Sequence, residues 1–87
     1  MTTTQRLARL EAAQEVLGFL MAARSELIYN ERKKATPDTV KIAQWEEERN
    51  AFFDIEDDLR LDNEEAINKV IDTYGPQARE MFGAHAH

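Results

Sequence analysis

The sequence contains no cysteine, which excludes the disulfides and thiolate–metal sites that stabilise many small proteins. It also has only two prolines and three glycines, so few positions interrupt a helix. No run of about 18 apolar residues occurs, which predicts that the chain has no transmembrane helix. The N-terminal residues lack the hydrophobic segment of a signal peptide, so we expect a cytoplasmic protein with no membrane partner.

The chain is short. Its 87 residues predict one domain, residues 1–87, with a small core. Chains of this size commonly need a covalent staple, a metal or a partner subunit to be stable. Because the composition excludes a disulfide or thiolate–metal staple, we expect a homodimer.

The charge is unevenly distributed along the chain, whose formal net charge is −6. Residues 1–34 contain six Lys or Arg against four acids, whereas residues 35–87 contain five against thirteen. Nucleic-acid phosphates bind clustered Lys and Arg, so this balance predicts no direct nucleic-acid binding.

A long first helix is expected over about residues 4–35, where nothing interrupts a helical pattern. One face repeats at alternating spacings of three and four and consists of Leu7, Leu10, Gln14, Leu17, Met21, Arg24 and Ile28. A helix of about 30 residues is about 45 Å long, more than one small core covers. We therefore expect part of this helix to contact another subunit.

A turn and a second helix follow. Thr36 suits the N-cap and Pro37 the first helical position of a helix over about residues 37–60. The two helices are thus predicted to form an antiparallel hairpin. Arg24 and Glu48 lie equally far from Thr36, so this register predicts an interhelical ion pair between them.

A short third helix is expected over residues 63–74, with Asp62 as its N-cap. Gly75-Pro76 is predicted to end it and to begin a terminal helical turn over 76–82. The tail 83–87 is expected to be disordered. The fold class is therefore all-α, a long helical hairpin with a short third helix.

Two outer surfaces are candidates for binding. Phe19 falls off the apolar face of the first helix, so we expect it to be exposed in a dimer or docking face with its neighbours Ala12 and Val16. The second surface is acidic, because residues 46–65 hold ten acids and two bases. Its expected partner-binding residues are Glu46, Glu47, Asp54, Asp57 and Asp58.

The acidic face has three interpretations. It binds a basic protein surface, it binds a divalent cation, or it is a solvated face that only increases solubility. Like charges at i and i+4, such as Asp54 and Asp58, repel by a few tenths of a kcal/mol, which a binding role would explain.

No residue pattern predicts catalysis. The only serine is Ser25 on the long helix, and the only histidines are in the tail. All-helical nucleoside-triphosphate pyrophosphohydrolases bind magnesium through Glu-Glu-x-x-Glu and Glu-x-x-Asp, and neither pattern occurs here: Glu46-Glu47-Glu48 is followed by Arg49-Asn50. We therefore expect no catalytic residue, metal site or cofactor.

The functional hypothesis is a dimeric adaptor, inhibitor or regulator that presents its acidic face to a basic partner surface. In size and charge the chain is similar to many phage- and plasmid-encoded regulators, which is an analogy of class only. The alternative is a structural subunit or assembly factor of a larger helical complex. A metal-dependent nucleotide pyrophosphohydrolase is a remote third possibility.

Overall fold

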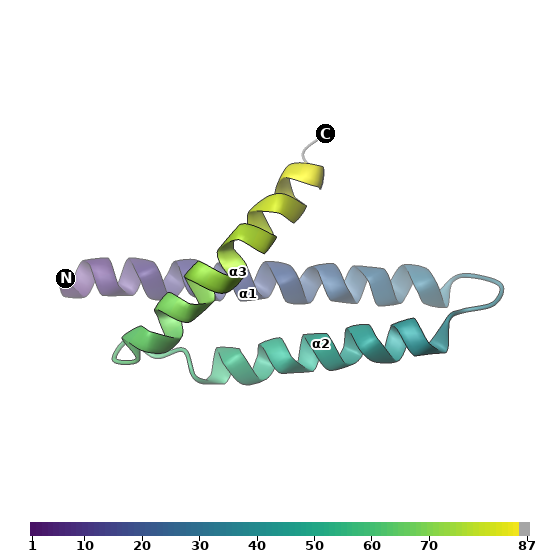
Figure 1. The fold of residues 1–87 in the computed structure, drawn as a ribbon, viewed down its shortest axis with the longest axis horizontal. Coiled ribbons are helices and arrows are strands. Elements are labelled where there is room, and N and C mark those ends of the chain that lie inside the picture. The colour runs from purple at the N-terminus through teal and green to yellow at the C-terminus, as the bar shows by residue number, and fades with distance from the viewer. Residues whose placement is uncertain (86–87) are drawn as a thin grey trace.

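The computed structural model describes residues 1–85, and the side chains of residues 1–81. The described residues form three helices joined by turns, with no strand among them. The helices are α1 (Thr3–Arg32), α2 (Thr39–Asp57) and α3 (Glu64–His85). α1 and α2 run antiparallel side by side, and α3 crosses α1 (Figure 1). The all-α fold with a helical hairpin is therefore confirmed.

α1 begins two residues after the chain start because Thr2 and Gln5 cap each other. The Thr2 hydroxyl accepts a hydrogen bond from the Gln5 backbone N–H at 3.2 Å, and the Gln5 side chain accepts one from the Thr2 N–H at 2.9 Å. This reciprocal arrangement satisfies two backbone donors that a helix start leaves free.

The turn between α1 and α2 differs from the sequence-based expectation. Thr36 does not cap α2; Asp38 does, and its carboxylate accepts hydrogen bonds from the N–H groups of Val40 and Lys41 at 3.1 Å. Pro37 accordingly lies in the turn and not in the first helical position. α1 ends at Arg32 and α2 at Asp57, each three residues earlier than predicted.

α3 is longer than predicted. Asn63, not Asp62, caps it: its side-chain oxygen accepts a hydrogen bond from the Ala66 N–H at 3.2 Å. The predicted break at Gly75-Pro76 does not occur, and Pro76 lies inside the helix. Part of the predicted disordered tail, residues 83–85, is also helical, and residues 86–87 lie outside the described residues.

The helix continues through Pro76 because its apolar stripe continues. Tyr74 and Met81 pack against the core on either side of the proline, and Ala78 is buried, whereas Pro76 itself is exposed. A proline inside a helix costs about 3 kcal/mol, which the packing of this stripe offsets.

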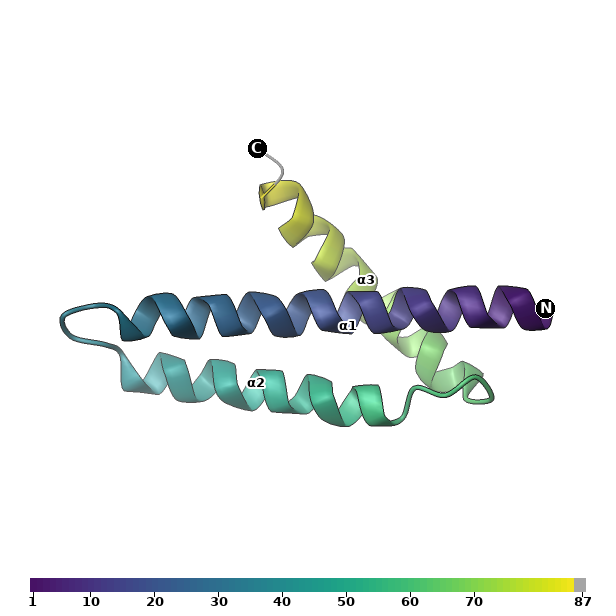
Figure 2. The ribbon, with the colours of Figure 1, turned by 180° about the vertical axis from the view of Figure 1, so that it is seen from behind.

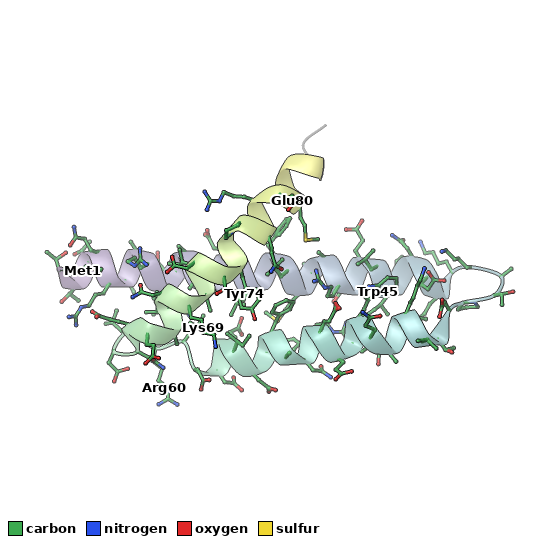
Figure 3. The ribbon with its side chains drawn as sticks, viewed as in Figure 1. Met1, Trp45, Arg60, Lys69, Tyr74 and Glu80 are labelled. Carbon is green, nitrogen blue, oxygen red and sulfur yellow. The ribbon has the colours of Figure 1, made fainter. Side chains whose placement is uncertain are left out.

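The core forms where α3 crosses the hairpin. Its fully buried residues on α1 are Ala13, Leu17 and Leu20. Phe52 of α2 meets Tyr74 of α3 edge to face, with ring centroids 5.5 Å apart. Figure 3 shows Tyr74 at this crossing and Trp45 farther along α2 toward the turn.

The molecule is elongated and one of its faces is uncovered. Its extents are 53 × 30 × 15 Å and its radius of gyration is 15.0 Å, against about 12 Å for a compact chain of this length. α3 lies on one face of the hairpin only. From behind, α1 passes in front of α3 where the two helices cross (Figure 2).

Candidate functional site

The predicted ion pair between α1 and α2 is present. Arg24 Nε donates to Glu48 Oε2 at 3.0 Å, and both side chains are partly buried. The Arg24 guanidinium also lies over the Phe52 ring, 5.5 Å from its centroid, and donates to the Met81 sulfur at 3.9 Å. Arg24 therefore contacts α2 and α3 from α1. These contacts are those of a residue that fixes helix register.

Further polar contacts join α1 to α2. Arg49 donates to the Ser25 hydroxyl at 3.0 Å, and Arg32 donates to Glu46 at 2.7 Å. Glu46 is therefore already paired within the chain. We therefore exclude Glu46 from the partner-binding face, because it lies on the side of α2 next to α1.

The buried carboxylate of Glu31 was not singled out by the sequence. Glu31 is 5% exposed and is the only charged residue in the core of the described chain. Its carboxylate accepts hydrogen bonds from Lys34 Nζ at 3.0 Å and from the Asp38 backbone N–H at 3.1 Å. These two hydrogen bonds, the one from Lys34 first, lower the pKa of Glu31 below its ordinary value of 4.5. Glu31 thus organises the turn from inside.

The predicted docking face at Ala12, Val16 and Phe19 lies beside α3 and stays a prediction. These residues line one side of a groove of about 460 Å³, and Ile71, Gly75, Ala78 and Arg79 of α3 line the other. Val16 and Phe19 pack against the core. The prediction that Phe19 is exposed in the monomer is wrong, because α3 continues past Pro76 and crosses here.

The other four residues predicted for the acidic face are exposed, as expected. Four carboxylates of α2 and its C-cap are exposed, and the described chain gives none of them an ion pair: Glu47, Asp54, Asp57 and Asp58. We call these four residues the acidic face. Glu31, Glu46, Glu48 and Glu64, in contrast, each pair with a Lys or Arg.

The acidic face also opposes the dipole of its own helix. Asp54, Asp57 and Asp58 lie at the C-terminal end of α2, whose last turn contains no basic residue. The C-terminus of a helix carries partial negative charge, so each such carboxylate there costs about 0.3–1 kcal/mol at low ionic strength.

The uncovered side of the hairpin has an apolar surface of its own. We define the back face as Leu7, Gly18, Ala22 and Tyr29 of α1 with Phe53 of α2. Leu7 is 46% exposed, Tyr29 61% and Phe53 49%. Gly18 has a clear space around it, since a Cβ there would meet nothing within 4 Å. Nothing inside the chain therefore requires glycine at this helical position, where it costs about 0.5–1 kcal/mol relative to alanine.

The described residues contain no cluster of three or more His, Asp or Glu arranged to hold a metal ion. Among the same residues, no helix is both long and apolar enough to span a bilayer.

Comparison with known proteins gives no relatives. No family model, no curated protein and no solved structure matches this chain. Its function is therefore argued from its own surfaces.

Proposed function

We propose that this chain is a protein-interaction module, an adaptor, inhibitor or regulator, that binds a basic surface of a partner protein through the acidic face. The supporting observation is which carboxylates form ion pairs within the chain. Glu46, Glu48 and Glu64 each pair with an Arg of α1, whereas Glu47, Asp54, Asp57 and Asp58 are exposed and form no ion pair within the described chain.

The cost of this arrangement supports the same proposal. A face that served only solubility could carry its charge anywhere on the surface, including the N-terminal turn of α2, where acids are favourable. Three of these carboxylates instead lie at the unfavourable end of the helix. A cationic partner would relieve that repulsion and so gain affinity from it.

The test is charge reversal with a matched control. The acidic-face variant carries Asp54→Lys, Asp57→Lys and Asp58→Lys. The control makes the same change in net charge at three exposed acids elsewhere, with Glu26→Lys, Asp72→Lys and Glu80→Lys. Each protein is immobilised and exposed to lysate of the source organism, and captured proteins are identified by mass spectrometry and then titrated in purified form.

The proposal expects a captured protein with a basic surface. Its affinity should fall at least about tenfold, or 1.4 kcal/mol, in the acidic-face variant and much less in the control. The acidic-face variant should at the same time be slightly more stable than the wild type, because lysines favour a helix C-terminus. Equal capture by both variants, or no capture of a basic partner by the wild type, contradicts the proposal.

A further inference from the structure

The chain exposes more surface than a protein of its mass usually does. Its accessible surface is 6198 Å², whereas a compact monomer of 10.0 kDa exposes about 5,200 Å². The excess is close to the area of about 800 Å² that each partner contributes to a standard interface. The area is therefore sufficient for one stable interface.

The back face lies opposite α3 and runs along α1 as a stripe of four residues, with the polar residues Glu11, Gln14 and Ser25 between them. Leu7, Gly18, Ala22 and Tyr29 fall within about 60° of one another on a helix of 3.6 residues per turn. The side of α1 that packs under α3 lies on the other side of the helix. The hairpin register that pairs Arg24 with Glu48 also places Phe53 beside the turn of α1 that contains Gly18.

The back face is also symmetric about Gly18. Leu7 lies eleven residues before Gly18, and Tyr29 lies eleven residues after it. If a second α1 packed antiparallel with Gly18 against Gly18, the Leu7 of each copy would meet the Tyr29 of the other. The glycines would let the two helix backbones approach closely at the centre.

The two ends of the molecule carry opposite charge. The turn between α1 and α2 is basic: Arg32 and Lys34 pair with Glu46 and Glu31, and Lys33 and Lys41 form no ion pair within the described chain. The connection between α2 and α3 lies near the opposite end of the long axis (Figure 1). This end is acidic: beside Arg60 and the Arg6–Glu64 pair it carries Asp62 and Glu65, which form no ion pair within the described chain. An antiparallel pair therefore brings the basic end of each copy to the acidic end of the other.

From these observations we propose that the back face binds a second copy of this chain, related by a two-fold axis near Gly18. Apolar contacts, helix register and end charges are each self-complementary under the same rotation, which is the requirement for a closed dimer. An unrelated partner would need none of this symmetry. The acidic face is exposed on α2 and borders the back face where Asp57 follows Phe53 by one helical turn. The dimer does not depend on the proposed function, because separate variants test the two proposals.

The first test replaces Gly18 with a larger residue. Gly18→Leu puts a side chain where the isolated chain has open space, so the helix is retained or strengthened. Ala51→Leu adds bulk at an exposed position outside the back face and serves as the control. Sedimentation velocity at micromolar concentrations should give twice the mass of 10.0 kDa for the wild type and the control, and the single-chain mass for Gly18→Leu. Circular dichroism checks that all three remain helical.

The second test exchanges charge between the ends. Lys33 and Asp62 form no ion pair within the described chain, so Lys33→Glu and Asp62→Lys change no internal salt bridge. Lys33 Nζ lies over the ring of Tyr29, 4.0 Å from its centroid, so Lys33→Ala is the control for loss of that contact. Each single charge reversal should raise the dimer dissociation constant severalfold, and the double variant should recover much of the loss. A monomeric wild type, or a Gly18→Leu protein that remains dimeric, overturns the proposal.

Discussion

Phe52 is the residue whose replacement tests the packing of the three helices most directly. It belongs to α2, is 6% exposed, meets Tyr74 of α3 edge to face and lies under the Arg24 guanidinium of α1. Truncating a buried phenylalanine to alanine typically costs about 3–5 kcal/mol. A chain of this length has a total stability of about 4–13 kcal/mol. Phe52→Ala should therefore remove much of the stability or unfold the protein.

Phe52→Leu keeps most of the apolar volume and isolates the contribution of the ring. The edge-to-face contact is worth about 0.5–1.5 kcal/mol, and the cation–π contact about 0.5–1 kcal/mol. We therefore expect Phe52→Leu to lose about 1–2.5 kcal/mol. The measurement is urea unfolding, followed by fluorescence of the single tryptophan, Trp45, and by circular dichroism. At 76% exposed, Val40 provides the control substitution Val40→Ala. A loss below about 0.5 kcal/mol, the range of ordinary surface changes, would refute the packing argument.

Four further predictions concern the polar contacts and the proline. Glu31→Gln should destabilise the protein at neutral pH. Because the folded-state pKa of Glu31 is lowered, its contribution is full above pH 4.5 and is lost as the pH falls through the folded-state pKa, so unfolding curves of wild type and variant should converge in acid. A double-mutant cycle of Arg24→Ala with Glu48→Ala should give a coupling of about 0.5–1 kcal/mol, and independent losses would contradict a working ion pair. Asp38→Ala should cost about 1 kcal/mol in urea unfolding through loss of the α2 cap, whereas an unchanged midpoint would show that the cap contributes nothing. Pro76→Ala should raise the stability by up to about 3 kcal/mol, and a loss instead would mean that proline fits α3 without strain.

The hairpin could be predicted from the sequence because its determinants are local. Apolar residues at spacings of three and four define both helices, and Pro37 marks the turn. Counting from that turn was sufficient to pair Arg24 with Glu48. The caps were less predictable, because neighbouring Thr, Asp and Asn residues are all good capping residues and tertiary contacts decide between them. At the turn, the decisive contact is the bond from the Asp38 N–H to Glu31, which helical periodicity does not reveal.

The burial of Phe19 was mispredicted for a related reason. Gly75-Pro76 is a strong local signal for a helix end, but the apolar stripe through Tyr74, Ala78 and Met81 continues across it. Local propensity and tertiary packing disagreed, and packing decided the outcome. Once α3 extends past Pro76, it covers the side of α1 that contains Phe19 and leaves the opposite side open. On this open side the apolar residues of α1, from Leu7 to Tyr29, are separated by polar residues. Their pattern is therefore too weak to be recognised from the sequence alone.

The arrangement of α2 and α3 on a shared α1 has a consequence for how the protein folds and opens. Each of the two later helices packs along α1, and the contact between α2 and α3 themselves is smaller and includes the Phe52–Tyr74 pair. The hairpin closes through a connection of only six residues, 33–38, so its contacts are short in sequence and form rapidly. We expect α3 to dock after the hairpin has closed, because its contacts with α1 join residues that lie farther apart in the sequence. Amide hydrogen exchange should accordingly be slowest in the middle of α1, near Leu17, and faster throughout α3.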